Sequence, residues 1–317
     1  YNVAGSGTRG FSGDGGPAVK AEMSPGSLTV DAAGNLVIAD GGNNRVRVVA
    51  AVTGTFYGQA MTAGDIYTVA GDGSSEFTGD FLPAVNTGLT ARSVAVDAAG
   101  NLVIADGGNN RVRVVAAITG TFYGQAMTAQ DIYTVAGDGT AGVTGNGGPA
   151  LHADVSPFGM AVDPAGNLVL SDAGDNVIRV VAAKGGTFYG KKMTAGDIYP
   201  VAGTGTAGFA GDGGPAASAE FHVPLDVTVG PAGNLVIDDE VNGRIRLVAE
   251  ASGTFYGIAM TKGDIYTVAG DGHSNWSGDG GPATSSSLYN PEGVAVDSAG
   301  NLYIGDTFNR RVREVAS

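Results

Sequence analysis

Two aspartates on either side of one short turn are the strongest candidates for chemistry in this sequence. A turn centred near residues 231–232 would place Asp226 and Asp238 opposite each other on two strands of a hairpin. Two ionised carboxylates that close repel each other, so we expect them to share a proton, bind a cation or meet a basic ligand. Glu240 and Glu292 would add to the same negative patch. The alternative interpretation is that these are solvated surface carboxylates without a role.

A histidine lies four residues before the first of these aspartates. His222, Asp226 and Asp238 form a constellation that could perform general acid–base chemistry. Isolated loop histidines are most often plain surface residues, so catalysis is the weaker interpretation. No His-x-x-x-His pair or carboxylate–histidine spacing supports a zinc site, and the chain has no cysteine. A cation held by Asp226 and Asp238 is the metal hypothesis that these residues leave open.

An internal repeat determines the elements that position these residues. The dipeptide Gly-Asn recurs at intervals of 66, 66, 67 and 67 residues, and repeats one and two agree at 42 of the 44 positions from 30–73 and 96–139. Each repeat contains four segments that read as short β-strands separated by turns. In the second repeat they are 93–97, 101–106, 111–115 and 132–137. Four strands repeated at a fixed period are typical of propeller blades.

The two ends of the sequence indicate how many blades there are. Residues 1–5 match the fourth strand of a repeat, and the last repeat stops just past its third strand. We therefore predict an all-β fold, a five-bladed β-propeller of four-stranded antiparallel blades, in which the N-terminal strand completes the last blade. A sixth blade would need sequence that is not present. The predicted single domain, 1–317, comprises repeat units at about 6–71, 72–137, 138–203, 204–270 and 271–317 plus 1–5.

Two motifs carry a family resemblance. Gly-Asp-Gly-Gly-Pro-Ala at 13–18, 211–216 and 278–283, followed by segments such as 291–313, resembles the NHL repeat over essentially the whole chain. The resemblance implies a propeller in a secreted or surface-exposed bacterial protein. The family includes interaction scaffolds, extracellular sensor domains and, more distantly, lyases and hydrolases. The sequence departs from it in having five repeats rather than the usual six, and in about ten extra residues per repeat, such as 56–65.

Composition restricts the classes of partner. The 317 residues include 55 glycines, 17 basic and 31 acidic side chains, with a formal charge of −14. This balance argues against a phosphate-binding surface, so we expect no nucleic-acid partner. No apolar run approaches the roughly 20 residues that span a bilayer. Of the 31 acids, 23 recur at repeated positions, which indicates structural roles, and three of the remaining eight cluster in the fourth repeat.

The repeated charged residues have expected structural roles. Nine of the 12 arginines occupy two positions of strand three, where we expect them to pair with the aspartate that ends strand two. The Gly-Asp-Gly-Gly loops lack the basic residue and the following helix of a phosphate-binding loop. Their aspartates are expected to cap turns, and calcium is the one cofactor that these oxygen ligands leave open.

Positions that differ between repeats are candidates for specificity. The residue after the start of strand one differs in every repeat, and we expect these residues to form a variable rim at the mouth of the central channel. They are Gly26, Arg92, Phe158, Leu225 and Glu292. In the fifth repeat, Trp276, Phe308 and Tyr289 are candidates for an aromatic platform that binds a sugar or peptide. The alternative is that these aromatic residues pack within their loops.

These observations favour a monomeric binding module over an enzyme. The expected ligand is a protein, peptide or carbohydrate at the channel mouth, around Arg92, Phe158, Asp226, Asp238 and Glu292. One alternative is a lyase or hydrolase that uses the paired carboxylates or a divalent cation at the same place. Another is a lectin with one pocket in each blade, which the near identity of repeats one and two favours slightly.

Overall fold

The chain is all-β, with short 3-10 turns and no α-helix, in a computed structural model that describes residues 1–317. It divides into two compact units. Unit 1 comprises Tyr1–Ala141 and Leu151–Pro157, and unit 2 comprises Gly142–Ala150 and Phe158–Ser317. None of the helical segments has the length and apolarity needed to cross a membrane.

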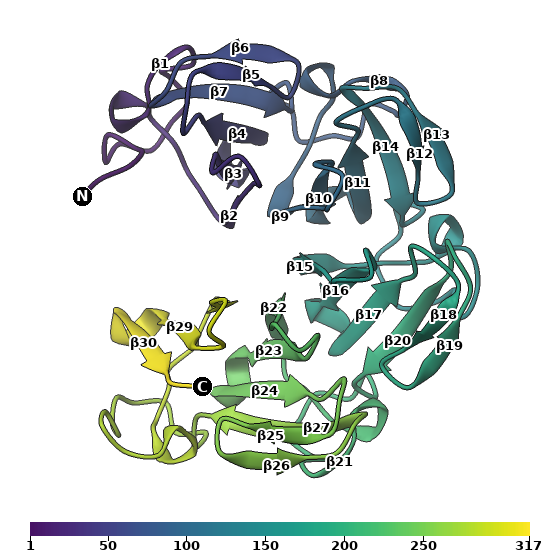
Figure 1. Ribbon diagram of the computed structural model, residues 1–317, viewed down its shortest axis with the longest axis vertical. Helices are drawn as coiled ribbons and strands as arrows, with labels where there is room; N and C mark the ends of the chain where they lie inside the picture. Colours follow the sequence, from purple (N-terminus) through teal and green to yellow (C-terminus); the bar gives the residue numbers. More distant parts are fainter. The chain divides into compact units, whose positions relative to one another are not determined.

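Unit 1 contains two five-stranded antiparallel sheets, blade 1 (order β1-β7-β4-β3-β2) and blade 2 (order β8-β14-β11-β10-β9), each with a two-stranded hairpin (Figure 1). The strands are β1 (Gly16–Pro17), β2 (Leu28–Val30), β3 (Leu36–Asp40), β4 (Arg45–Val49), β5 (Gly54–Phe56), β6 (Gln59–Met61), β7 (Asp65–Ala70), β8 (Leu82–Pro83), β9 (Ala91–Val96), β10 (Leu102–Asp106), β11 (Arg111–Val115), β12 (Gly120–Phe122), β13 (Gln125–Met127) and β14 (Asp131–Ala136). The 3-10 turns are η1 (Ala18–Lys20), η2 (Gly41–Asn43), η3 (Ala84–Asn86) and η4 (Gly107–Asn109).

The remaining sheets are blade 3 (β15-β16-β17-β20), blade 4 (β21-β27-β24-β23-β22) and blade 5 (β28-β29-β30), with hairpins β18-β19 and β25-β26. The strands are β15 (Pro157–Val162), β16 (Leu168–Asp172), β17 (Val177–Val181), β18 (Gly186–Phe188), β19 (Lys191–Met193), β20 (Ile198–Ala202), β21 (Gly214–Pro215), β22 (Pro224–Val229), β23 (Leu235–Asp239), β24 (Arg244–Val248), β25 (Gly253–Phe255), β26 (Ile258–Met260), β27 (Asp264–Ala269), β28 (Val294–Val296), β29 (Leu302–Asp306) and β30 (Arg311–Val315). The 3-10 turns are η5 (Ala150–His152), η6 (Ala173–Asp175), η7 (Ala216–Ser218), η8 (Glu240–Asn242), η9 (Ala283–Ser285) and η10 (Thr307–Asn309).

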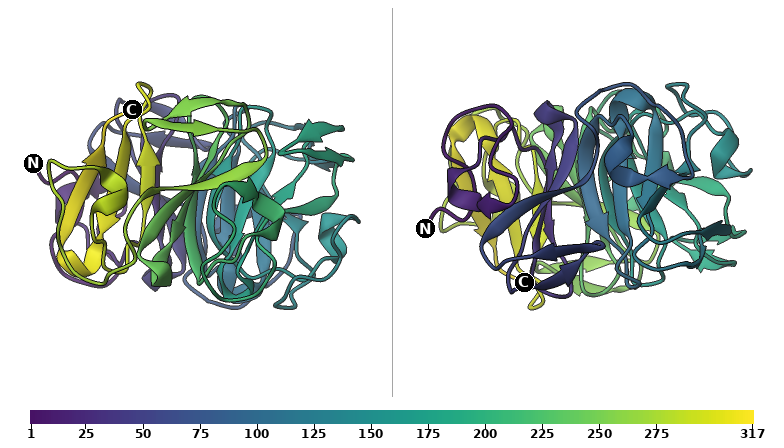
Figure 2. Two further views of the ribbon diagram at one scale, coloured as in Figure 1. Left: turned by 90° about the horizontal axis from the view of Figure 1, so that it is seen from below. Right: turned by 90° about the horizontal axis from the view of Figure 1, so that it is seen from above.

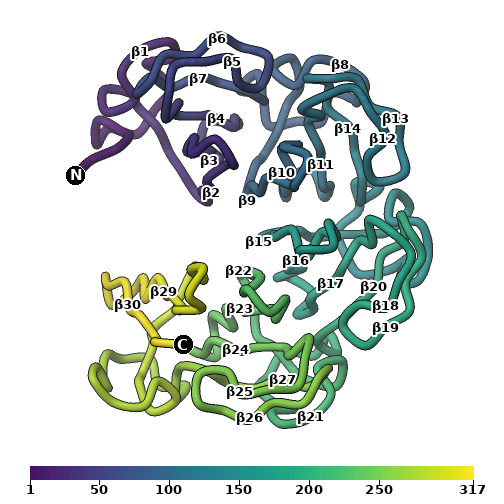
Figure 3. The backbone as a smooth tube through the Cα atoms, viewed as in Figure 1, coloured from purple at the N-terminus to yellow at the C-terminus, as the bar shows by residue number.

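Neighbouring blades within a unit share a core, because successive side chains of each strand point to opposite faces. In blade 4 the trace crosses the sheet from β22 through β23 and β24 to β27 (Figure 3), and the strands of this blade are drawn in green in Figure 2. Ile237 of β23 packs with blade 3, whereas Val236 packs with Leu288 and Val294 of blade 5. Each residue of β23 therefore faces one neighbouring blade or the other, and a polar residue on this strand is buried between blades.

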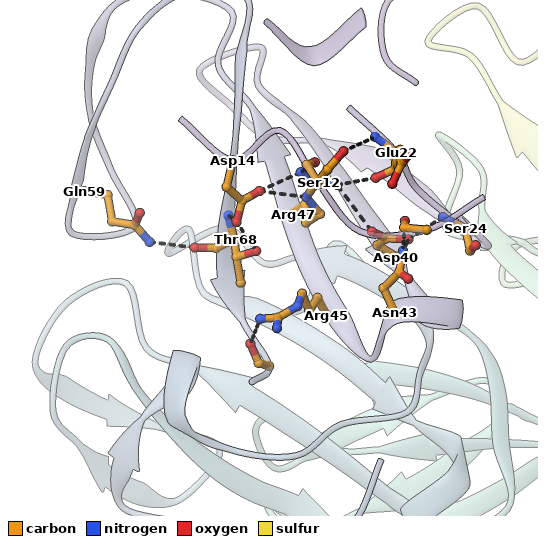
Figure 4. Close-up of polar contacts among 12 residues, drawn as sticks. Ser12, Asp14, Glu22, Ser24, Asp40, Asn43, Arg45, Arg47, Gln59 and Thr68 are labelled. Carbon is orange, nitrogen blue, oxygen red and sulfur yellow. Dashed lines mark hydrogen bonds and ion pairs between the residues drawn. The ribbon is translucent and has the colours of Figure 1, made fainter. Parts of the chain in front are cut away.

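An arginine on the third long strand, buried in blades 1 to 4, ties together parts of each blade. In blade 1 the Arg47 side chain is fully buried, lies 3.5 Å from Asp40 at the end of β3 and donates to Asp14 at 2.6 Å (Figure 4). Asp14 also accepts hydrogen bonds from the backbone and hydroxyl of Thr68 on β7. The same arginine–aspartate pair recurs in every blade, which confirms the pairing expected from the sequence.

The turn between the first two strands is held by one aspartate with four donors. In blade 1, Asp31 Oδ1 accepts the backbone N–H groups of Ala33 and Asn35, both at 2.9 Å. Its Oδ2 accepts Asn35 Nδ2 at 2.9 Å and the hydroxyl of Tyr57, from the hairpin β5–β6, at 3.0 Å. Asp97 and Asp163 accept the same four donors in blades 2 and 3. The inserted hairpins are thereby anchored to their own blades.

The fold class is that of a five-bladed β-propeller, as the sequence predicts. The predicted strands are present to within two residues at each end. The hairpins inside the extra residues and the two-residue fifth strands β1, β8 and β21 were not predicted. Blade 5 has three strands, and residues 1–5 are not in a strand. Strand pairing between residues 1–5 and β30, and the single domain, stay predictions.

Removing the buried arginine should unfold unit 1 more easily. We expect Arg47→Met to lower the free energy of unfolding by about 3–5 kcal/mol, because Asp40 would remain buried without its cation. Arg9→Met, at an exposed arginine of the same unit, should change it by less than about 0.5 kcal/mol. Urea denaturation followed by circular dichroism measures both, and equal effects of the two substitutions would contradict the account.

Candidate functional site

A β-bulge interrupts the hairpin β22–β23 of blade 4 at two residues of the predicted site. Val227 pairs with Ile237 and Pro224 pairs with Asp239, so Leu225 and Asp226 together face the single residue Asp238. The predicted register is confirmed from Val227 to the turn, and the bulge begins where the two aspartates meet. The same bulge occurs in blade 2, where Ala105 pairs with Ser93 and Asp106 pairs with Ala91, so it is a feature of the repeat.

Asp226 lies between the first strands of the blades on either side of it. Its Oδ2 accepts the backbone N–H of Val294 on β28 at 3.1 Å. On the other side, a Cβ atom at Gly159 would lie only 2.6 Å from the Asp226 Cα, so β22 can approach β15 because residue 159 is glycine. The equivalent residues of blades 1 and 2 are Ser27 and Ser93, whose hydroxyls lie 3.3 Å apart. Asp226 is therefore the one ionisable residue at this repeated position.

Asp238 is fully buried, and neither of its carboxylate oxygens has a hydrogen-bond partner. It occupies the repeat position that is alanine in blades 1 and 2, where Ala39 packs with Leu89 and Val94 of the next blade. A carboxyl group has thus replaced a methyl group at the packed interface between two blades. Leaving a buried polar group without partners costs about 1–3 kcal/mol, so this residue reduces stability.

Two glutamates lie on the exposed side of these aspartates. Glu240 begins η8 and accepts a hydrogen bond from Asn290 Nδ2 of the neighbouring blade at 3.1 Å. Glu292 is exposed, and its backbone N–H donates to the Gly305 carbonyl at 3.1 Å. The His222 backbone is fixed by Asp239, to which its N–H donates at 2.8 Å. We call Asp226, Asp238, Glu240 and Glu292 the acidic cluster.

The surroundings of the acidic cluster favour protonated carboxyl groups. Burial raises the pKa of Asp226 to about 6, against the N–H groups of Val294 and Val227, which lower it. Burial raises the pKa of Asp238 well above its usual value, and the charges of Asp226 and Glu240 raise it further. Burial also raises the pKa of Glu240. Asp226 and Asp238 therefore cannot both be ionised unless a cation is bound beside them.

The cluster does not resemble a ready metal centre. No three or more acidic, histidine or cysteine side chains in the chain converge to hold one ion. A cation at Asp226 and Asp238 would thus need backbone carbonyl or water ligands. The loop aspartates considered for calcium hold arginines: Asp212 accepts Arg246 at 2.7 Å, and Asp279 accepts Arg313 at 2.7 Å.

The other predicted site residues belong to different units or have structural contacts. Arg92 is exposed on β9 in unit 1, and Phe158 is partly buried on β15 in unit 2, so the predicted rim is not assembled within either unit. Phe308 packs on Tyr289 with ring centroids 5.2 Å apart. Trp276 stacks on the Arg311 guanidinium at 4.1 Å.

The stack of Trp276 is part of the repeat. Phe11, Phe77 and Phe209 stack in the same way on Arg45, Arg111 and Arg244. The structure therefore supports the loop-packing alternative for Trp276 over the aromatic platform. Gly159, Val294 and Asn290 contact the acidic cluster and were not predicted as site residues from the sequence. The glycines at 159 and 293 share the repeat position of Asp226, and that substitution pattern was the available signal.

Solved structures similar to this chain are propellers by fold. A streptogramin B lyase matches with a TM-score of 0.50 and 11% identity, over 93% of this chain and 66% of its own. A protein of unknown function and a putative phosphatase, both from Bacteroides thetaiotaomicron, match with TM-scores of 0.54 and 15% identity. The chain is covered over 100% and 99%, and spans 75% and 77% of those two proteins.

The fold is that of a β-propeller. No protein-family model matches the chain, and no curated protein matches it in sequence. At these identities the likeness shows the fold alone, and the NHL family is not confirmed. The chain also spans less than two thirds of the lyase's length.

Replacing Asp238 with the alanine of blades 1 and 2 should stabilise the protein in a pH-dependent way. The folded-state pKa values of Asp226 and Asp238 lie above the unfolded value of about 4. The stability that they contribute is therefore complete below pH 4 and is lost as the pH rises through about 6 and beyond. We expect Asp238→Ala to raise the unfolding free energy by about 1–3 kcal/mol at pH 8, and by less at pH 5.

Urea denaturation of wild type and Asp238→Ala at both pH values measures this difference. Glu76→Gln, at an exposed acid of unit 1, is the control and should leave stability unchanged at either pH. A variant less stable than wild type at pH 8 would show that Asp238 has stabilising partners.

Proposed function

We propose that this protein is a binding module and that the acidic cluster of blade 4 takes a cationic group of its ligand. The observation that carries the proposal is Asp238, a buried carboxyl with two unpartnered oxygens next to Asp226. Residues retained at a cost in stability are typical of functional sites. Secretion or display at the cell surface belongs to the proposal and rests on the resemblance to NHL repeats.

A cationic group would reduce the electrostatic repulsion between the carboxylates of the acidic cluster. Asp226 is partly exposed, Glu240 is partly buried and Glu292 is exposed, so these three offer carboxylate oxygens that a ligand can reach. Asp238 lies beneath them and would ionise when a positive charge arrives, because its pKa is raised partly by its acidic neighbours. Ligand binding should then release protons. An ammonium group fits better than a divalent metal, since no three acidic side chains converge on one point.

Enzymatic activity is a second candidate function, and one observation favours it. The two aspartates have different surroundings: Asp226 has N–H donors and partial exposure, and Asp238 has neither. Such pairs can divide the roles of base and acid, with Asp226 ionised and Asp238 protonated at neutral pH. The His222 side chain makes no hydrogen bond that would support a catalytic role. The lectin alternative gains no support either, because the pockets described are lined by positions that are not equivalent between blades.

Calorimetric titration at pH 8 with 1,4-diaminobutane and with a short lysine-containing peptide tests the proposal. We expect binding that weakens with salt and is at least about tenfold weaker in Asp226→Asn and Glu292→Gln. The control Glu76→Gln should bind as the wild type does. Absence of binding by both probes, or binding that neither cluster substitution weakens, would contradict a cation site in blade 4.

A further inference from the structure

One turn of blade 4 lacks the aspartate that holds the corresponding turn of every other blade. Gly230 stands where blades 1, 2, 3 and 5 have Asp31, Asp97, Asp163 and Asp297. The turn keeps its shape without it: the Gly230 N–H donates to the Asn234 carbonyl at 2.9 Å, and the Gly233 N–H donates to the Gly230 carbonyl at 2.9 Å. The backbone and asparagine donors that surround an aspartate elsewhere are thus in place.

Three of these donors have no acceptor within the protein. In the other four blades the aspartate accepts the two backbone N–H groups and the asparagine Nδ2 of its turn, at 2.8–2.9 Å. In blade 4 the equivalent groups are the Ala232 N–H, the Asn234 N–H and Asn234 Nδ2, and none of them donates a hydrogen bond. Asn234 is only 4% exposed, and its Oδ1 accepts the Glu250 N–H, which fixes the direction of its Nδ2.

The fourth donor, a tyrosine hydroxyl, bonds a different acceptor in blade 4. Tyr57, Tyr123 and Tyr189 donate their hydroxyls to the aspartates of blades 1 to 3. Tyr256 of blade 4 donates instead to the Gly300 carbonyl of blade 5, at 2.9 Å. Its hydroxyl can return to an acceptor beside Asn234, as it does in the other blades.

A pocket lies at this turn. It has a volume of about 230 Å³, and Gly230, Asn234 and Tyr256 line it together with the apolar side chains of Val236, Leu247 and Phe255. The missing group is the –CH2–COO⁻ of an aspartate, which is the size of acetate. The pocket is larger than this group and continues along apolar side chains.

We propose that this pocket binds an aliphatic monocarboxylate, whose carboxylate takes the place of the missing aspartate. The Ala232 and Asn234 N–H groups would donate to one oxygen, and Asn234 Nδ2 and the Tyr256 hydroxyl to the other, as in blades 1 to 3. The aliphatic chain would lie against Val236, Leu247 and Phe255. The nearby acid Glu250 is paired with Lys262 at 3.0 Å, so its charge opposes an anion less.

Chemical complementation in the wild type and Gly230→Asp tests the proposal. Gly230 is not in the left-handed region, and a Cβ there would meet its nearest atoms at 3.8 Å, so aspartate fits without strain. With the wild type, 100 mM acetate, propionate or butyrate at pH 8 should raise the melting temperature by about 2–4 °C, increasingly with chain length. Gly230→Asp should melt higher than the wild type without any carboxylate and should not respond to one.

Three controls separate this site from general effects. Sodium chloride at equal ionic strength and acetamide, the neutral analogue of acetate, should not reproduce the shift. Asp97→Gly creates the same set of free donors in blade 2, so acetate should raise its melting temperature more than that of the wild type. Equal responses of wild type and Gly230→Asp would overturn the proposal, as would a stronger effect of N-acetylglycine, which carries the carboxylate of a peptide C-terminus.

Discussion

This structure depends on matching the oxygens of its repeated aspartates with hydrogen-bond donors. Blade 1 places carboxylates where several donors converge: Asp40 and Asp14 around a buried arginine, and Asp31 around four donors that hold its turn. Asp40 is fully buried, Asp31 is partly buried and Asp14 is exposed, so loss of partners would destabilise the blade most at Asp40. Most of the acidity of the chain is therefore internal architecture, and its formal charge of −14 says little about partners.

The hairpin β22–β23 departs from this matching at both ends: one end lacks donors and the other lacks an acceptor. Near Asp238 there are carboxylate oxygens without donors, and at Gly230 there are donors without a carboxylate. The first end attracts positive charge and the second attracts an anion. The two ends are four residues apart along each strand, from Asp226 to Gly230 and from Asn234 to Asp238. A zwitterionic molecule cannot reach both through the packed sheet, so they are separate sites.

Much of this could be predicted from the sequence because the repeat shows its own exceptions. The strands, the arginine–aspartate pairs and the departure of Asp226 and Asp238 from the pattern all follow from comparing repeats. The bulge at Leu225 could not be predicted, since the turn length and the hydrophobic pattern are the same with and without it. The sequence shows that Gly230 replaces an aspartate, but not which donors lose their acceptor. The four donors of the equivalent Asp31 come from its own turn and from a hairpin 26 residues away. The stack of Trp276 on Arg311 likewise needed three-dimensional placement.

The most direct test restores the repeat in this one hairpin. The triple variant Asp226→Ser, Gly230→Asp and Asp238→Ala carries residues that occur at the same positions in blades 1 and 2, and its free energy of unfolding at pH 8 can be compared with that of the wild type by urea denaturation. If blade 4 gives up stability for its two sites, the variant should be more stable by at least about 2 kcal/mol. A variant of equal or lower stability would contradict the account, because it would mean that Asp226, Gly230 and Asp238 already have the partners they need.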